Sequence, residues 1–252
     1  MVLSEADRFE FIGLNFHNLS LVRAIDLLEH FIQSGSPHMV FTPTAELIVW
    51  ANENQRLKDI YNCTDLLTAD GFVVHYAARL CGKPINEPVS AVRLMFKFLE
   101  VASKKEYRLY LLGAKEDIVN KAVDNIKANY PAINIVGWHN GYFDFNNDAK
   151  IISDIREKKP DVLFVAMSSP LKENFISKNL EAMGVPVCMG VGGSFDIIAG
   201  KYHLAPMWIS KIGLEWLYRL IQEPKRLWRR YLVTNTKFLC LLTKELLKKR
   251  ED

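Results

Sequence analysis

The sequence predicts an α/β fold: a mostly parallel β-sheet flanked by helices, followed by a basic, amphipathic helical appendage. Short apolar runs such as VLFVA and RLYLL alternate with amphipathic segments, which is the strand–helix order of a parallel sheet. These runs are apolar throughout, as expected for strands that helices cover on both faces. Strand patterning stops near Gly200, so we expect one domain over residues 1–200 and the appendage over residues 201–252.

Each strand is expected where apolar and β-branched residues form a short run between turn residues. The expected strands span residues 11–14, 39–42, 66–68, 109–112, 133–136, 162–166 and 187–190. Ser20 is placed to cap a helix that continues to about residue 33, and Thr44 to cap the next helix. Further helices are expected over residues 72–80, 89–102, 116–129, 148–158 and 172–183. The order predicts a Rossmann-like sheet. In the tail, Pro224 is expected to separate two helices.

The composition indicates a folded protein of a reducing compartment. Of 252 residues, 49% are hydrophobic and 24% are charged, which is typical of globular rather than disordered chains. Four cysteines are scattered without a CxxC pair, so we interpret them as small buried side chains. The N-terminus has no charged region followed by an apolar run, so no signal peptide is expected. No apolar run approaches the ~20 residues that span a bilayer, so any membrane contact is expected to be peripheral.

Polar residues and glycines follow the predicted strands, at the edge where parallel α/β sheets bind ligands. They include Thr42, Thr44, Asp70, Gly113, Ser169, Gly192 and Gly193. We expect the side chains and backbone amides at these strand ends to meet on one rim. That rim is the candidate site.

Several common sites lack their motifs. The sequence contains no GxxxxGK[ST] phosphate loop and no GxSxG nucleophile elbow, and no GxGxxG follows a strand. No pair of carboxylates stands at a strand end to hold Mg²⁺ on a diphosphate, so phosphate chemistry here is expected to need no metal. The loop GVGGSFD over residues 190–196 has two interpretations: its backbone amides approach an anion, or it is a tight turn that packs a helix on the sheet.

Two charged residues near the strand ends each have a structural and a functional interpretation. Asp70 follows an apolar strand and precedes a helix, so capping that helix is the favoured interpretation. The alternative is a general base at the mouth of the sheet. Lys172 opens a helix, where anions are the usual neighbours. It is either a solvated lysine on the helix surface or a cation that faces a ligand.

The tail carries the positive charge of the chain. From residue 201 onward, 12 Lys/Arg oppose 5 Asp/Glu, a balance of +7, whereas residues 1–200 carry −4. Within residues 206–250, Arg219, Arg226 and Arg229 recur among five Trp and Tyr residues, which is typical of an amphipathic element at a membrane surface. Nucleic-acid binding is the weaker alternative, because no RNA- or DNA-binding fold is recognisable. An exposed apolar face on the tail would also favour a homo-oligomer off the membrane.

Four motifs together resemble the WecG/TagA/CpsF family, glycosyltransferase family twenty-six, over about residues 11–231. They are ADG at 69–71, GYF at 141–143, GVGGSFDIIAGK at 190–201 and LEWLYRLIQEPKRLWRRY at 214–231. The resemblance implies a GT-E fold and an inverting glycosyltransferase without a metal or other cofactor. It implies transfer of a sugar of N-acetylmannosamine, uronate or glucose type from a UDP donor to an undecaprenyl-diphosphate-linked sugar. The product would be a cell-surface polysaccharide, made on the inner face of the bacterial plasma membrane.

The resemblance also implies roles for individual residues. Asp70 would be the catalytic base. Donor and nucleotide contacts would come from Thr42, Thr44, Gly113, Tyr142, Lys172, Gly192, Gly193 and Asp196. The appendage arginines Arg219, Arg226 and Arg229 would fold over the site and neutralise the diphosphate, a task elsewhere given to Mg²⁺.

This sequence departs from the family pattern at several positions. Lys172 replaces a glutamine of the usual SPKQE, Thr44 stands where asparagine is common, and Leu204 replaces an arginine. We hypothesise that Lys172 pairs with a charged donor group, either a uronate carboxylate or the diphosphate. The departures also leave an alternative function open: a catalytically silent, sugar-nucleotide-binding scaffold subunit of a polysaccharide assembly complex.

Overall fold

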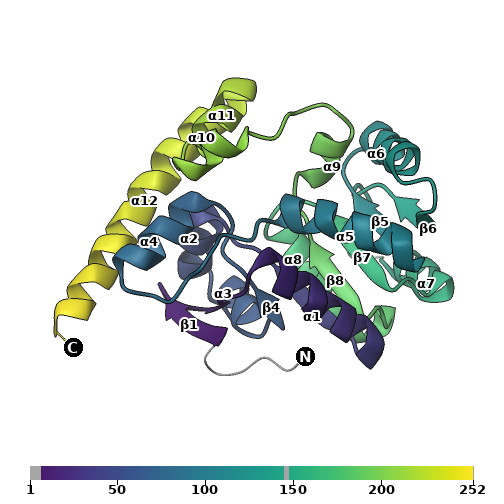
Figure 1. Cartoon of the computed structure of the whole chain (residues 1–252), viewed down its shortest axis with the longest axis horizontal. Coiled ribbons are helices and arrows are strands. Elements are labelled where there is room, and N and C mark those ends of the chain that lie inside the picture. The colour runs from purple at the N-terminus through teal and green to yellow at the C-terminus, as the bar shows by residue number, and fades with distance from the viewer. Residues whose placement is uncertain (1–6, 145–147, 252) are drawn as a thin grey trace.

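The computed structural model describes residues 7–144 and 148–251. Its centre is a six-stranded sheet in the order β4-β3-β8-β7-β5-β6, in which every pair of neighbours is parallel (Figure 1). The strands are β3 (His38–Phe41), β4 (Leu66–Leu67), β5 (Arg108–Gly113), β6 (Asn134–His139), β7 (Val162–Ala166) and β8 (Val187–Gly190). The predicted α/β class with a parallel sheet is confirmed.

Helices cover both faces of the sheet, which explains why the central strands β7 and β8 are apolar and buried along their whole length. One face is covered by α1 (Leu21–Ser34), α5 (Ala91–Lys105), α6 (Glu116–Asn129) and α9 (Ser194–Ile198). The other is covered by α2 (Ala45–Glu53), α3 (Gln55–Asn62), α4 (Phe72–Leu80), α7 (Ala149–Lys158) and α8 (Leu171–Met183). Along β5, Leu109 and Leu111 enter the first layer and Tyr110 and Leu112 the second, the two-residue alternation of a strand.

An antiparallel hairpin near the N-terminus packs into the second layer. It consists of β1 (Arg8–Phe11) and β2 (Leu14–His17), which Ile12 and Gly13 join with φ angles of 48° and 72°. Two successive residues with positive φ make the tight turn typical of a hairpin. The expected strand over residues 11–14 is therefore wrong, because these residues span the turn and contribute one strand end on either side of it.

Most other expected elements are confirmed, with ends that differ by a few residues. The helix over residues 116–129 is reproduced in full as α6, and Ser20 and Thr44 cap α1 and α2 through their side chains. Strand β6 continues to His139 instead of ending at residue 136. Helices α3 and α9 were not among the predicted elements. They are 8 and 5 residues long, too short to establish a clear helical period in the sequence.

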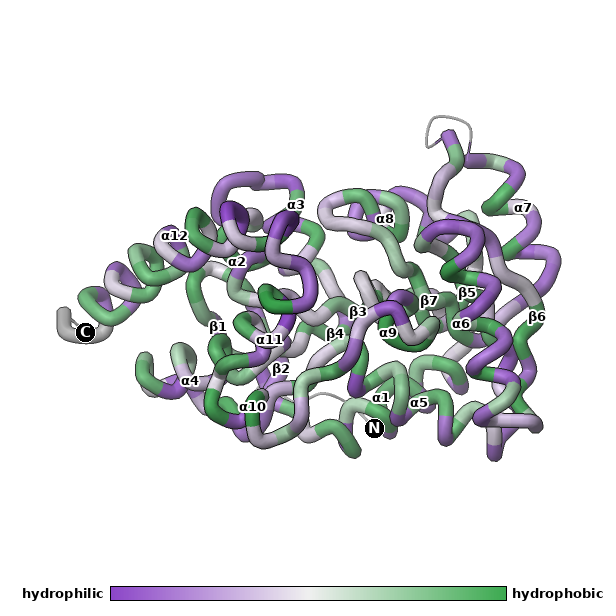
Figure 2. Tube along the Cα trace, turned by 90° about the horizontal axis from the view of Figure 1, so that it is seen from above, coloured by the Kyte–Doolittle hydropathy of each residue, from purple (hydrophilic) through white to green (hydrophobic). Residues whose placement is uncertain are grey.

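The appendage consists of α10 (Met207–Lys211), α11 (Glu215–Gln222) and α12 (Pro224–Glu251). Because α12 begins at Pro224, the predicted break between two tail helices is confirmed. Helix α12 packs along α2, and its Leu227, Thr234 and Phe238 are buried (Figure 1). Figure 2 shows α10 and α11 beside α4 on the same side of the molecule. The appendage thus rests against the body over a long surface.

Two predictions about the compartment and the membrane can be compared with the fold. Among the described residues, no helix is both long enough and apolar enough to cross a bilayer. All four cysteines are free thiols. Their prediction as buried side chains is confirmed for Cys81 and Cys188 but wrong for Cys63 and Cys240, which are exposed on α3's end and on α12.

Candidate functional site

The residues at the strand ends lie on one edge of the sheet, because all six strands are parallel. Thr42 follows β3, Asp70 lies shortly after β4, and Gly192 and Gly193 follow β8. Gly113 is the last residue of β5. The predicted convergence on one rim is confirmed, and this rim is the candidate active site.

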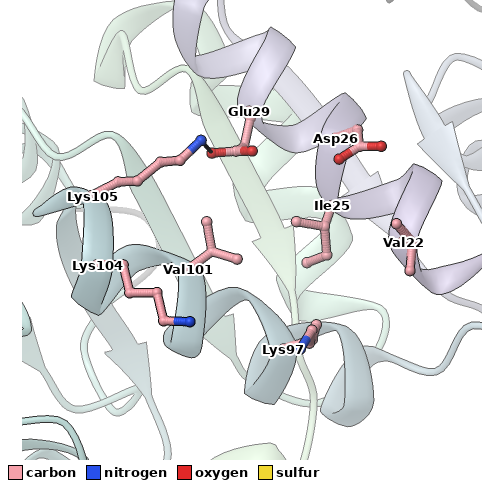
Figure 3. Close-up of a pocket in the computed structure, with 8 residues that line it drawn as sticks. All are labelled: Val22, Ile25, Asp26, Glu29, Lys97, Val101, Lys104 and Lys105. Carbon is pink, nitrogen blue, oxygen red and sulfur yellow. Dashed lines mark ion pairs between the residues drawn. The ribbon is translucent and has the colours of Figure 1, made fainter.

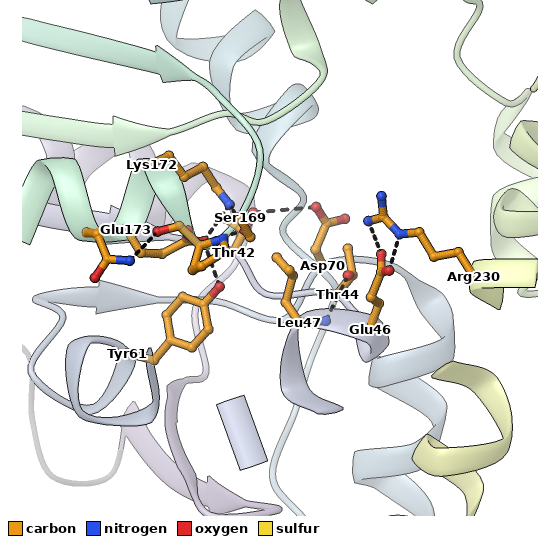
Figure 4. Close-up of polar contacts among 12 residues, drawn as sticks. Thr42, Thr44, Glu46, Leu47, Tyr61, Asp70, Ser169, Lys172, Glu173 and Arg230 are labelled. Carbon is orange, nitrogen blue, oxygen red and sulfur yellow. Dashed lines mark hydrogen bonds and ion pairs between the residues drawn. The ribbon is translucent and has the colours of Figure 1, made fainter. Parts of the chain in front are cut away.

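Asp70 is half-buried at this rim and is held by the ends of neighbouring elements (Figure 4). Its backbone N–H donates to the Pro43 carbonyl at 3.2 Å, which ties the chain after β4 to the chain after β3. Thr42 Oγ1 donates to Asp70 Oδ2 over a long 3.4 Å. The carboxylate also accepts the Ala91 N–H at the start of α5. Helix α4 begins at Phe72, and its N-cap is Gly71, which offers no side chain, so the favoured interpretation of Asp70 as its cap is wrong.

The surroundings of Asp70 tune its protonation. Burial, and after it the negative charge of Glu215, raise the pKa of the Asp70 carboxyl to about 7. The Ala91 N–H, the Arg219 guanidinium and the Thr42 hydroxyl act in the opposite direction and lower this pKa. A general base is most effective when its pKa lies near the operating pH. Asp70 is therefore suited to accept a proton near neutrality.

Helix α11 supplies charges to this rim from the appendage. Glu215 and Arg219 are four residues apart and share one face of the helix. Both act electrostatically on Asp70. Arg219 Nη2 also lies 3.7 Å from the position that a Cβ atom on Gly193 would take. Arg219 thus connects the end of β4 with the glycine loop that follows β8.

The other two predicted arginines lie further along the appendage, on α12. Arg226 makes a bidentate ion pair with Glu223, at 2.6 and 2.8 Å. Arg229 is exposed. Within the described ranges, neither Arg219 nor Arg229 makes an ion pair, so both guanidinium groups are available for an anion.

Lys172 lies in a buried polar cluster under the ends of β7 and β8. Its side chain is 8% exposed, and its Nζ contacts both Ser169 Oγ and Glu173 Oε1 (Figure 4). Glu173 also accepts hydrogen bonds from the Tyr61 hydroxyl at 2.8 Å and from Ser169 at 2.7 Å. Burial and the Glu173 charge raise the pKa of Tyr61 well above its usual value. The interpretation of Lys172 as a solvated lysine is wrong, and its pairing with a donor charge stays a prediction.

Two of the predicted donor-site residues have structural partners. Thr44 Oγ1 accepts the Leu47 N–H at 3.5 Å as the N-cap of α2. Asp196 Oδ1 pairs with Lys201 Nζ at 2.8 Å at the start of α9. Tyr142 lies after β6, and its side chain is 73% exposed, so its ring is free to meet a ligand.

Gly113 allows the closest backbone approach in the sheet. Its φ is 132°, and a Cβ atom there would lie 2.3 Å from the Ala166 carbonyl oxygen at the end of β7. Gly141 lies close to Gly113, because a Cβ atom on Gly141 would lie 3.0 Å from Gly113 Cα. The glycines bring the ends of β5, β7 and the chain after β6 together, which shapes this part of the rim.

Three functional groups of the site were not among the predicted residues. Glu215 had a signal in the sequence, because it precedes Arg219 by four residues on the same helix face. No sequence signal marked Tyr61 or Glu46. Tyr61 pairs with Glu173 and Glu46 pairs with Arg230, and each partner lies more than 100 positions away along the chain. In the described part of the chain, no group of three or more His, Cys, Asp or Glu side chains is arranged to hold a metal ion.

A hollow of about 270 Å³ lies between α1 and α5, away from the strand ends (Figure 3). Its floor is apolar, formed by Val22, Ile25 and Val101. Charged side chains surround it, and Lys105 pairs with Glu29 across it at 2.5 Å. None of the predicted site residues lines this hollow, so it is separate from the rim.

Known proteins resemble this chain over most of its length. The profile of the glycosyl transferase WecG/TagA/CpsF family matches residues 9–252. Relatives named N-acetylglucosaminyldiphosphoundecaprenol N-acetyl-beta-D-mannosaminyltransferase occur in Bacillus subtilis (strain 168), Bacillus spizizenii (strain W23) and Staphylococcus aureus (strain MW2). They are 32%, 30% and 29% identical to this chain, respectively. The matches cover 94%, 87% and 90% of this chain, and 92%, 84% and 89% of the relatives. The chain therefore belongs to the WecG/TagA/CpsF family and is a glycosyltransferase.

Proposed function

We propose that this protein transfers N-acetylmannosamine from its UDP derivative to N-acetylglucosamine linked to undecaprenyl diphosphate. The printed names of the similar proteins support both the transferred sugar and the acceptor. The observation that carries the proposal is Asp70: a half-buried carboxyl at the strand-end rim, with a pKa near 7 and two appendage charges beside it. Uronate and glucose donors lack comparable support.

In the proposed reaction, Asp70 accepts the proton of the acceptor hydroxyl while that oxygen bonds to the anomeric carbon. The bond from this carbon to the β-phosphate oxygen breaks, and UDP leaves with the electron pair. Attack from the face opposite the leaving group inverts the configuration. Arg219 and Arg229 stabilise the negative charge that develops on the diphosphate, because neither guanidinium group makes an ion pair with a carboxylate in the described ranges.

The proposed acceptor is a lipid, and an apolar surface next to the rim suits a bilayer. On the appendage, Trp208 of α10, Ile212 directly after this helix and Trp228 of α12 are exposed. Helix α4 of the body adds a stripe, because Val73, Tyr76 and Leu80 recur on one face and are all exposed. The Tyr76 hydroxyl contacts the Lys211 carbonyl, so the two surfaces adjoin. Since α4 starts directly after Asp70 and Gly71, membrane contact here would place the base at the lipid surface.

The test is UDP release from UDP-N-acetylmannosamine, with polyprenyl-diphosphate N-acetylglucosamine in detergent and EDTA present. We expect acceptor-dependent release that Asp70→Asn abolishes while UDP binding persists, because the amide cannot accept the proton. UDP-glucose and UDP-glucuronate serve as donor controls. Cosedimentation with anionic vesicles tests membrane binding by this surface, and we expect Leu80→Glu to weaken that binding.

UDP binding without release from any of these donors would contradict the proposal and favour the scaffold alternative. Release from the uronate donor alone would contradict N-acetylmannosamine as the transferred sugar. It would remain consistent with the proposed transfer reaction. Release that EDTA abolishes would contradict the role given to the arginines, because a metal would then carry the diphosphate charge.

A further inference from the structure

Arg230 of α12 binds the appendage to the body through α2. Its Nε and one Nη form a bidentate ion pair with the two carboxylate oxygens of Glu46 (Figure 4). The same guanidinium lies 5.1 Å from the centre of the Trp50 ring. Because the guanidinium is planar, a bidentate pair with a stacked ring fixes orientation as well as distance. These contacts set where α12 lies on α2.

Both sides of this contact lead to the proposed catalytic base. Glu46 lies in the first turn of α2, just after Pro43, whose carbonyl accepts the Asp70 N–H. On the other side, Tyr231 follows Arg230 and packs edge-on against Trp216 of α11, with ring centres 6.1 Å apart. Helix α11 carries the two charges that act on Asp70. The contacts of Arg230 with Glu46 and Trp50, called the grip below, therefore fix the position of α11 relative to the end of β4.

We propose that Arg230 is a positioning residue for sugar transfer: by gripping Glu46 and Trp50, it holds α11 with Glu215 and Arg219 over Asp70. This inference rests on the proposed function and gives Arg230 a task that differs from that of Arg219, Arg226 and Arg229. The family resemblance assigns those three arginines to the diphosphate, whereas the Arg230 guanidinium is already bound to the body of the protein.

A second ion pair between the same helices provides a matched control. Lys237 of α12 pairs with Glu53 of α2, at the same sequence separation as Arg230 and Glu46. Both of its side chains are about half-exposed, 48% and 49%, whereas the Glu46 side chain is 10% exposed. Exposed pairs of this kind contribute little to stability. Lys237→Ala removes a charge from the same face of α12 but leaves the grip intact.

The experiment compares full-length Arg230→Ala, Arg230→Lys, Lys237→Ala and the charge swap Arg230→Glu with Glu46→Arg. Each is measured for kcat and donor KM across pH, and for hydrogen exchange of the α11 amides. For Arg230→Ala we expect kcat/KM to fall on the order of 10–100-fold, because the site charges lose their geometry. We expect faster exchange in α11, partial rescue by Arg230→Lys and by the swap, and no change in Lys237→Ala.

The pH profile separates positioning from a general loss of structure. Thr42, the Ala91 N–H, Glu215 and Arg219 face Asp70. If α11 moves away, Asp70 loses the Glu215 charge and part of its burial, which outweigh the simultaneous loss of the Arg219 charge. The pKa of Asp70 then falls, and the acidic limb of kcat/KM shifts to lower pH. Arg230→Ala with wild-type kinetics and wild-type exchange in α11 would overturn the inference. So would an equal effect of Lys237→Ala.

Failure of the proposed function has a different signature. If the wild-type protein transfers no sugar, the reaction is wrong, yet hydrogen exchange still reports whether Arg230 holds α11. If Arg230→Ala does not fold, Arg230→Lys carries the test, since lysine keeps the charge but makes only a single contact. Wild-type kcat/KM and α11 exchange in Arg230→Lys would then contradict the need for a bidentate grip.

Discussion

At Asp70, opposing forces act on one proton. Burial and the Glu215 carboxylate favour the protonated carboxyl, whereas the Ala91 N–H, Arg219 and Thr42 favour the carboxylate. The result is a pKa of about 7, raised far above that of an exposed aspartate. Since the folded pKa lies above the unfolded one, the ionised group lowers stability fully above pH 7, and this cost disappears as the pH falls towards the unfolded pKa. The molecule thus keeps a destabilising group where a base is useful.

Glu215→Gln removes a charge that raises the pKa of Asp70. We expect that pKa to fall, so that the base is ionised at lower pH and the acidic limb of kcat/KM shifts to lower pH. Initial rates of UDP release across pH provide the measurement. Glu181→Gln, an exposed position on α8, should leave the limb in place. A shift towards higher pH, or none, would show that Glu215 does not act on Asp70.

The position of Asp70 could be predicted from the sequence, but its surroundings could not. A carboxyl after an apolar strand in a βαβα chain must lie at the carboxyl edge of the sheet. Its neighbours Glu215 and Arg219 arrive from a helix more than 140 positions later. The burial of Lys172 could not be predicted for a related reason: helical spacing does not reveal that the end of a strand covers its side chain.

Among the elements, β5 is the one most restricted by its last residue. Gly113 combines a φ of 132° with a backbone approach that leaves no room for a Cβ atom next to Ala166. Gly184 at the end of α8 also has a positive φ, 63°, but nothing lies within 4 Å of its Cβ position. Substitutions at the two glycines therefore distinguish the free-energy cost of a clash from that of a left-handed backbone conformation.

Gly113→Ala should lower the free energy of unfolding by at least about 3 kcal/mol, because strain and a backbone clash combine. Gly184→Ala should cost only about 1 kcal/mol, the penalty of a left-handed conformation without a clash. Urea unfolding followed by circular dichroism gives both values. Equal losses in the two variants would contradict the close approach of β5 to β7.

Elements of two turns or more with a clear amphipathic period were predicted well, and short or reversing segments were not. Helix α6 has its apolar residues at regular helical spacing and was located to the residue. The hairpin around Ile12 and Gly13 was read as one strand, because its apolar residues continue on both sides of the turn. In such a segment, the turn is marked only by a glycine that also suits other conformations.

Across the whole molecule, α12 serves as part of the cover of the body as well as a tail. Phe238 is buried in the core layer of α2, and Leu241, Leu242 and Leu246 pack against the same layer. Lys83 and Glu245 add an ion pair at 3.4 Å further along α12. The boundary near Gly200 was predicted from the end of the strand pattern, but the amphipathic pattern of the tail did not reveal which face of α12 meets the body.

Truncation after Gly200 should therefore expose the apolar side of α2 in addition to removing the arginines. We expect the shortened chain to self-associate, because the core layer under Phe238 loses its cover. Sedimentation velocity of the truncated and full-length proteins in the same buffer tests this. A monomeric truncated chain with an unchanged melting temperature would show that α12 is not needed to cover the body.

The pair of Glu46 and Arg230 joins positions 184 residues apart. Translation delivers α2 well before α12, so the sheet and its carboxyl edge can form on the ribosome while α12 is still being made. A chain interrupted before α12 would hold the proposed base without the contact that is proposed to position α11 over it. We expect such a chain not to turn over the sugar nucleotide.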